Sequence, residues 1–218
     1  KSIARDMLER FATFNDYVRE YELQRSEGVL LRYLSDAYKT LAQTVPESYR
    51  DDAVDEALQS LRRVVREADS SLIDEWERLQ RGDVEPSQPG SGGGPVGPTP
   101  REISARIRSD LHRLLKAVAE KAWDDALGCL APGHDWTAES LAAEAEPYFA
   151  AHDRIVLTPE ARRPSMVVVR SDAPGHWEAR QKILSPDGEA DWMLDCSATL
   201  ENGPLPDRPL LTLNRIGT

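Results

Sequence analysis

The stretch from Gly82 to Thr99 sets the organisation of the chain, because it cannot form a packed core. It contains six glycines and four prolines and almost no apolar side chain. A segment of this composition cannot bury enough apolar surface to offset the entropy that ordering would cost. We therefore predict a flexible linker over residues 82–99, with one domain at residues 1–81 and another at 100–218. As a random coil the linker spans roughly 20–25 Å, which lets the two domains move independently.

The charge balance limits the partners of the chain. Its 218 residues include 27 Lys and Arg against 38 Asp and Glu, which gives a formal net charge of -11. Neither half is basic, since residues 1–85 hold 13 basic and 19 acidic side chains and residues 86–218 hold 14 and 19. Phosphate neutralisation dominates nucleic-acid affinity, so the isolated chain should not bind bulk nucleic acid well. Any contact with a nucleic-acid strand has to be local.

The first domain has the pattern of a bundle of three or four helices. Apolar residues over Ile3–Tyr21 follow a helical spacing, with charged residues in the gaps, which predicts one helix there. Another helix start is expected at Ser48, which Asp51 follows in the manner of a capping box. The helix after it has an apolar stripe over Val54–Ala68.

An amphipathic helix over residues 26–43 lies at the centre of the first domain. Its apolar stripe recurs at three- and four-residue steps: Leu30, Leu34, Tyr38, Leu41 and Val45. Pro46 ends the helical run, since proline disfavours helical geometry in the residue before it. Polar side chains recur at the same period on the opposite side: Arg32, Ser35, Asp36, Lys39 and Gln43. That side is either a solvated surface or a surface that contacts a partner.

The second domain has the layout of an α+β fold. Thr99, Pro100 and Glu102 form a helix-start signal, and the helix that they open is expected to run past Trp123 to about Leu130. A second helix follows Thr137. Short β-rich runs come after it: Ile155–Leu157, Met166–Val169, Trp177–Leu184, Asp191–Leu200 and Leu210–Ile216. The tetrapeptide Ser185-Pro186-Asp187-Gly188 is expected to make a turn between two of them. We therefore predict helices packed on a curved, mainly antiparallel sheet.

The usual signatures of catalysis are missing from the sequence. No phosphate-binding run of the Gly-x-x-x-x-Gly-Lys-Ser/Thr type occurs. Asp74-Glu75-Trp76-Glu77 resembles an acidic metal-binding box, but it follows a helical pattern and is better interpreted as a solvated helix face. The four histidines do not have the spacing of metal ligands. Cys129 and Cys196 are interpreted as reduced core residues, with one disulfide as the alternative. We predict no catalytic residue, no metal site and no cofactor in this chain.

One family resemblance starts at the amphipathic helix. Glu27-Gly28, three further residues and Arg32, followed by Leu41 and Gln43, resemble the glycine-arginine helix of DExH-box superfamily II helicases of the exosome-helper type. Two strings extend the match to the C-terminal region of actinobacterial-type DEAD/DEAH-box helicases: Phe14–Tyr21 and Ser70–Trp76. In that family the ratchet helix of the C-terminal helical domain lies across the translocating nucleic-acid strand.

This resemblance implies a non-catalytic accessory region of a bacterial ATP-dependent helicase. Its helical part would contact a DNA or RNA strand through four side chains: Arg32, Ser35, Asp36 and Lys39. ATP and Mg would bind to motor domains of the same polypeptide ahead of Lys1, which is not a methionine and so suggests a piece of a longer chain. No apolar run approaches the length of a membrane span and no signal peptide is visible, so we expect a cytoplasmic location.

The second domain resembles a different fold. The order of its elements, with Trp123–Leu127 at the end of the first helix, is similar to cone-shaped domains of the ketosteroid-isomerase kind over about Arg101 to Gly217. That resemblance implies a pocket in which an Asp or His could act. The neighbours His134-Asp135 and His152-Asp153 lie at loop-like or helix-end positions, where adjacent side chains usually diverge. Asp191 and Asp195 are better interpreted as the polar side of a half-exposed strand. Core residues are the better interpretation of Trp177, Trp192 and Met193. The alternative function is a stand-alone protein-interaction or small-ligand-binding module that uses such a pocket.

Overall fold

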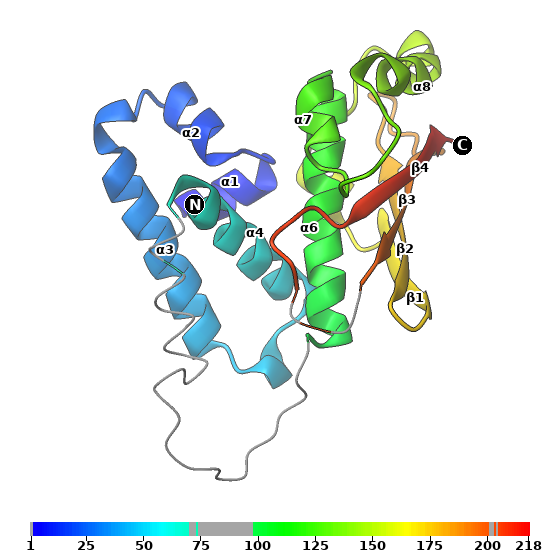
Figure 1. The fold of residues 1–218 in the computed structure, drawn as a ribbon. Helices are drawn as coiled ribbons and strands as arrows, with labels where there is room; N and C mark the ends of the chain where they lie inside the picture. The colour runs from blue at the N-terminus through cyan, green and yellow to red at the C-terminus, as the bar shows by residue number, and fades with distance from the viewer. Residues whose placement is uncertain (1, 70–72, 74–97, 201–202, 204) are drawn as a thin grey trace. The chain divides into compact units, whose positions relative to one another are not determined.

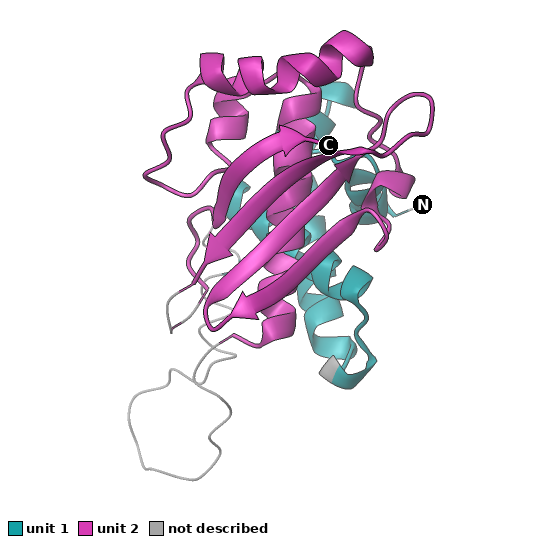
Figure 2. Cartoon of the chain, turned by 90° about the vertical axis from the view of Figure 1, so that its right-hand side faces the viewer, with its two compact units in different colours: residues 1–96 teal, residues 97–218 magenta. Residues whose placement is uncertain are grey.

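The structure is a computed structural model and describes residues 2–69, 73, 98–200, 203 and 205–218. The chain divides into two compact units, Lys1–Val96 (unit 1) and Gly97–Thr218 (unit 2), which Figure 2 shows in different colours. The linker predicted at residues 82–99 lies outside the described residues, apart from Pro98 and Thr99. The acidic box predicted to be a helix face, Asp74–Glu77, also lies outside them.

Unit 1 is a helical bundle, as predicted. Figure 1 shows its helices α1 (Ile3–Glu9), α2 (Phe14–Glu20), α3 (Glu27–Thr44) and α4 (Asp52–Ala68), with the 3-10 turns η1 (Gln24–Ser26) and η2 (Glu47–Tyr49). The buried core of unit 1 includes residues from all four helices: Met7, Tyr17, Leu30, Leu34, Tyr38, Leu58, Leu61 and Val65. The bundle therefore depends on each of these helices for the burial of its apolar surface.

The single helix expected over Ile3–Tyr21 is wrong, because the chain breaks it at Phe11. Phe11 has a left-handed backbone conformation, with a φ of 54°. The amide of Ala12 donates to the carbonyl of Met7 (2.9 Å), and the amide of Phe11 donates to the carbonyl of Leu8 (3.2 Å). This pair of bonds is a Schellman motif, which satisfies the last carbonyls of a helix and closes it. The stretch therefore forms two short helices, α1 and α2.

The predicted amphipathic helix is confirmed as α3, which ends before Pro46 as expected. Three residues of its apolar stripe are buried: Leu30, Leu34 and Tyr38. The next helix, α4, begins later than expected, because its cap is Asp51 and not Ser48. The Asp51 carboxylate accepts a hydrogen bond from the amide of Val54 (2.8 Å), which satisfies one of the free amides at the helix start.

Unit 2 begins with the helices α6 (Pro100–Ala119), α7 (Trp123–Leu127) and α8 (Ala138–Ala151), followed by the 3-10 helix η3 (Pro159–Arg162). The predicted start of α6 is confirmed, since Thr99 and Glu102 exchange the hydrogen bonds of a capping box. A continuous helix to Leu130 is wrong. Lys121 has a φ of 54°, and a second Schellman motif ends α6 before Trp123 starts α7.

A four-stranded antiparallel sheet follows the helices, so the predicted α+β layout is confirmed. Its strands are β1 (Val167–Ala173), β2 (His176–Ile183), β3 (Trp192–Thr199) and β4 (Leu211–Gly217), and they pair in chain order. The predicted turn joins β2 to β3: the amide of Gly188 donates to the carbonyl of Ser185 (3.1 Å), and Gly188 has a φ of 83°. The run Ile155–Leu157 is not a strand, although the amide of Val156 donates to the carbonyl of Leu184 (2.8 Å).

One face of the sheet is covered by α6, which crosses behind it in Figure 2. Alternate residues of β2 point to this covered face and are buried: Trp177, Ala179, Gln181 and Ile183. Cys129 and Cys196 are buried and free, in agreement with their interpretation as reduced core residues. Burial also raises the pKa of the Cys196 thiol, which keeps it protonated and unreactive.

The other face of the sheet carries charges of alternating sign across all four strands. Arg170 of β1 pairs with Glu178 of β2 (2.6 Å), and Arg180 of β2 reaches Asp195 of β3 (3.6 Å). Arg215 of β4 approaches the same Asp195 carboxylate (3.8 Å). No described helix of unit 2 covers this face (Figure 2). Exposed ion pairs of this kind contribute only about 0–1 kcal/mol each to the free energy of unfolding. These side chains therefore keep the face polar more than they stabilise the sheet.

Candidate functional site

The predicted nucleic-acid contact residues lie on α3. Arg32 and Asp36 are exposed, and Lys39 is half-buried. Within the described part of the chain, no hydrogen bond or ion pair engages any of these three side chains. Within the described residues these three charges therefore carry no ion pair and are available to a partner.

Ser35 does not share that exposed side. Its exposed fraction is 2%, and its hydroxyl has no hydrogen-bond partner among the described residues. Ser35 follows Arg32 by three residues, which turns it about 60° around the helix axis toward the packed side. Its burial leaves the hydroxyl out of reach of a nucleic-acid strand that lies along the exposed side of α3.

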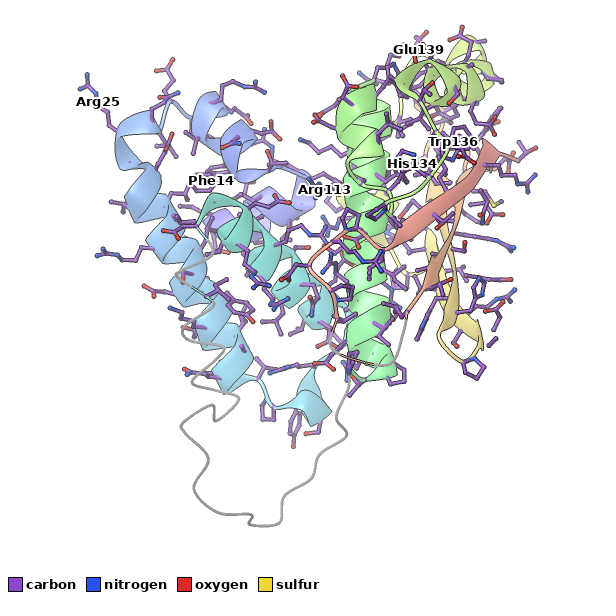
Figure 3. The ribbon with its side chains drawn as sticks, viewed as in Figure 1. Phe14, Arg25, Arg113, His134, Trp136 and Glu139 are labelled. Atoms are coloured by element: carbon purple, nitrogen blue, oxygen red, sulfur yellow. The ribbon has the colours of Figure 1, made fainter. Side chains whose placement is uncertain are left out.

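Arg25 extends the exposed charges beyond the start of α3. It lies in η1, is exposed, and points away from the bundle in Figure 3. Arg25, Arg32 and Lys39 follow one another at intervals of seven residues, which is about 10.5 Å along a helix. We call these three residues the cation row. Arg25 was not among the predicted nucleic-acid contact residues, although this seven-residue spacing of basic residues is visible in the sequence.

Two apolar side chains are exposed beside the cation row. Val29 has an exposed fraction of 74% and Tyr33 of 38%. They are four residues apart and so adjoin on the helix surface, with Arg32 next to them. An exposed aromatic ring can stack on a nucleic-acid base while neighbouring cations contact phosphates. The carboxylates of Glu27 and Asp36 on the same helix offset part of the positive charge, so this surface is amphipathic rather than strongly basic.

Unit 2 has a cavity of about 140 Å³ at the C-terminal end of α8. The end of α8, the turn between β2 and β3, and the start of β3 meet around it, although α8 and the turn are far apart in the sequence. The side chains that give the cavity its chemical character are Tyr148, His152, Ser185, Glu189, Asp191 and Trp192. Ile183, at the end of β2, adds an apolar contact.

One wall of the cavity is aromatic. The ring of Tyr148 meets the ring of Trp192 edge to face, with centroids 5.6 Å apart and an interplanar angle of 83°. The His152 ring lies 4.9 Å from Tyr148 on another side. The Tyr148 hydroxyl donates to the carbonyl of Arg154 (3.1 Å), and burial raises the pKa of Tyr148 to about 12. The phenol is therefore a neutral, fixed part of the wall at physiological pH.

Two exposed acidic residues also line the cavity. These are Glu189 and Asp191, and no described Lys or Arg lines it. The Ser185 hydroxyl accepts a hydrogen bond from the amide of Glu189 (3.1 Å), which fixes the turn before both acidic residues. The Nδ1 atom of His152 is 4.0 Å from an Asp187 carboxylate oxygen and has no hydrogen-bond partner in the described structure. A lining of aromatic and acidic residues suits a group that is positively charged or that donates hydrogen bonds.

Some residues of this cavity were predicted to have unrelated roles. His152, Asp191 and Trp192 were interpreted one by one as surface or core residues, and Glu189 was not considered. The available signal was local: Tyr148 and His152 are four residues apart at a helix end, and two acids alternate with other residues just before Trp192. Only the packing of α8 against the turn makes these two patterns one site.

The described part of the chain contains neither a group of metal-ligand side chains nor a helix that could span a membrane. There, no group of three or more His, Cys, Asp and Glu side chains is arranged to hold a metal ion. Among the same residues, no helix has the length and apolar character needed to cross a membrane.

Comparison with known proteins identifies a family. No curated protein and no solved structure matches the chain. One family model does match, and it is described as a domain of unknown function, DUF3516. The match runs over residues 1–215, which includes both units and both candidate surfaces. The chain therefore belongs to the DUF3516 family.

Proposed function

We propose that this chain is the non-catalytic C-terminal accessory region of a bacterial, cytoplasmic, ATP-dependent nucleic-acid helicase. In this proposal α3 lies along the translocating DNA or RNA strand. Unit 1 packs on motor domains of the same polypeptide, which bind ATP and Mg. Unit 2 binds a partner or regulates the motor, and the uncovered, charged face of its sheet is the surface on which a partner would fit.

The observation that carries the proposal is the cation row on α3. Arg25, Arg32 and Lys39 are not engaged by any described side chain, and Tyr33 is exposed beside them. Tyr33 and Val29 place exposed apolar surface on the same helix as Arg32 and Lys39. Cations that contact phosphates and a ring that stacks on a base are the two elements by which proteins hold single strands without sequence preference.

The acidic balance of the chain is compatible with this role only within a larger protein. Unit 1 cannot supply a strongly positive channel, because its acidic side chains outnumber its basic ones. The motor domains would supply most of the phosphate contacts, and α3 would form one wall of the channel. The coding sequence ahead of Lys1 gives a direct check: helicase motor motifs are expected there, and a start codon in their place would contradict the proposal.

The functional test is charge reversal on α3 in the complete helicase. We expect Arg32→Glu/Lys39→Glu to weaken single-strand affinity about tenfold or more, because the two cations that contact phosphates are lost. Nucleic-acid-stimulated ATPase activity should fall with the affinity. The salt dependence of binding should also decrease, since it scales with the number of phosphate contacts. Arg5→Glu/Arg19→Glu is the matched control. These two arginines have side-chain exposed fractions of 70% and 82%, lie on α1 and α2, and give the same change in net charge. Equal effects of the two double variants would reduce the cation row to a solvated surface.

A second candidate function is small-ligand binding by unit 2. The cavity beside Tyr148 and Trp192 favours it, because aromatic and acidic side chains line the same cavity. This function does not exclude the first, since the two surfaces belong to different units.

A further inference from the structure

We propose that the cavity at the end of α8 binds a small organic cation that carries an ammonium group. The inference rests on the second candidate function, ligand binding by unit 2, and names the class of ligand. It does not depend on the helicase proposal, because it concerns different residues.

The charge of the cavity requires a positive partner. Glu189 and Asp191 line it, and Asp187 lies in the same turn. His152 is the only described lining side chain that can become positive, and it already faces Asp187 at 4.0 Å. Two lining carboxylates therefore remain without a described lining cation, whatever the charge of His152. A negatively charged ligand would meet their repulsion.

The end of α8 adds to this preference. A helix of 14 residues ends at the cavity, and its last turn contains no basic side chain. The unsatisfied carbonyls at a helix C-terminus carry a partial negative charge that favours nearby cations. The negative end of α8 and the two carboxylates thus act in the same direction.

The aromatic wall explains why the ligand should be an organic ammonium rather than a bare metal ion. Trp192 and Tyr148 both line the cavity, and aromatic faces attract ammonium groups while their hydrocarbon surface accepts methyl groups. The same aromatic cluster already holds one ammonium: the Lys121 Nζ atom lies 4.2 Å from the ring centroid of Phe149, and Phe149 meets Tyr148 edge to face. The described residues offer no arrangement of metal ligands here.

The size of the cavity sets the size of the group that can enter. A protein cavity of about 150 Å³ holds a molecule as large as benzene. The cavity of about 140 Å³ therefore accommodates a trimethylammonium or tetramethylammonium group. A larger ligand would place only its ammonium end there.

The test is an NMR titration of the 218-residue chain at pH 8 with three probes: tetramethylammonium, tert-butanol and acetate. The first two are of similar size and differ in charge. We expect tetramethylammonium to shift the amide signals of Ser185 and Glu189 and the indole signal of Trp192, with a Kd on the order of 1–10 mM. We expect tert-butanol to bind at least fivefold more weakly and acetate not to bind, since only the cation gains from the carboxylates.

Two double variants make the test specific. Glu189→Gln/Asp191→Asn should weaken tetramethylammonium binding about tenfold or more, because it neutralises the two acidic side chains that line the cavity and keeps their shape. Glu139→Gln/Glu160→Gln removes two exposed carboxylates elsewhere in unit 2 and should leave the affinity within twofold; Figure 3 shows Glu139 near the start of α8. Equally tight binding of tert-butanol, or equal effects of the two double variants, would overturn the proposal that the ligand is a cation. Ligand binding by unit 2 would still stand. Binding of none of the probes would overturn both.

Discussion

Arg106 and Asp110 form a buried ion pair one turn apart on α6, with the Arg106 Nε atom 3.1 Å from the carboxylate. The rest of the guanidinium donates to three consecutive backbone carbonyls of the segment before β4: those of Pro206 (3.2 Å), Asp207 (3.4 Å) and Arg208 (3.1 Å). One side chain thus joins the first helix of unit 2 to its last strand.

The first prediction concerns this pair. Arg106→Met should lower the free energy of unfolding by about 3–5 kcal/mol, because it removes the buried ion pair with Asp110 and the three hydrogen bonds to the backbone carbonyls. Adding Asp110→Leu should recover part of the loss, since the two changes act on one interaction. Urea unfolding followed by far-UV circular dichroism measures both. Arg113→Met, on an exposed position of the same helix, is the control and should change stability by less than about 0.5 kcal/mol. Equal losses in Arg106→Met and Arg113→Met would contradict the assigned role.

The second prediction concerns the turn between β1 and β2. Gly175 has a φ of 76°, and a Cβ atom there would lie 2.6 Å from the carbonyl oxygen of Leu200. Gly175→Ala should therefore cost about 2 kcal/mol or more, from left-handed strain together with the displacement of backbone. Gly188→Ala has a similar φ of 83° and open space around the new atom, so it should show the strain alone, about 1–2 kcal/mol. Thermal unfolding of the two variants separates the backbone strain from the contact with the Leu200 carbonyl. Equal losses of stability would show that this carbonyl moves away from the new Cβ atom at no cost.

The third prediction concerns the pH dependence of stability. Burial raises the pKa of Tyr148 to about 12, above the usual value near 10 that it regains on unfolding. The neutral phenol therefore stabilises the folded state below pH 10, and this contribution is lost as the pH rises through 12. Tyr148→Phe should cost about 1 kcal/mol at pH 8 through the lost bond to the Arg154 carbonyl, and its deficit relative to the unmodified chain should shrink between pH 10 and 12.

Urea unfolding at pH 8, 10 and 11.5 gives this difference directly. Tyr49→Phe is the control, because Tyr49 has an exposed fraction of 82%. Its difference from the unmodified chain should stay constant over the same range. A constant difference for Tyr148→Phe as well would show that the phenol titrates alike in the folded and unfolded chains.

The fourth prediction follows from the position of Ser35. Its buried hydroxyl has no hydrogen-bond partner among the described residues, so Ser35→Ala should leave stability unchanged or raise it by about 0.5–1 kcal/mol. The gain would come from removing an unsatisfied polar group and from the higher helix propensity of alanine. In the complete helicase that we propose, the same change should leave strand affinity unaltered, in contrast to charge reversal at Arg32. A loss of stability above 1 kcal/mol would show that the hydroxyl has a partner.

The sequence predicts helices best where the cap is made by side chains. The box formed by Thr99 and Glu102 is visible as a pattern and is present in the structure. Three other helix ends are closed by residues with a positive φ that are not glycine: Phe11, Glu22 and Lys121. Such positions usually carry glycine or asparagine, so the sequence contains no marker for them. The breaks at Phe11 and Lys121 explain why two long helices were expected where the chain forms two pairs of shorter ones.

Of the two candidate sites, the surface of α3 could be predicted from the sequence and the cavity of unit 2 could not. The exposed side of α3 follows from helical period alone, because all of its residues lie on one element. Period alone did not place Ser35, which lies at the border of the packed face, where the position of α4 decides whether it is covered. The cavity of unit 2 could not be predicted, since Tyr148 meets Glu189 and Asp191 only after α8 packs across the end of the sheet.

The contacts of Arg106 also set an order of events during synthesis. The strands pair in chain order, so each needs only its neighbour in sequence, and the sheet can grow as the chain lengthens. The three carbonyls that receive the guanidinium, by contrast, lie about a hundred residues after it. Until residue 208 has left the ribosome, α6 exposes a charged pair that the finished unit buries. A nascent chain that stalls before β4 is therefore left with an incomplete core and a ready target for chaperones and proteases.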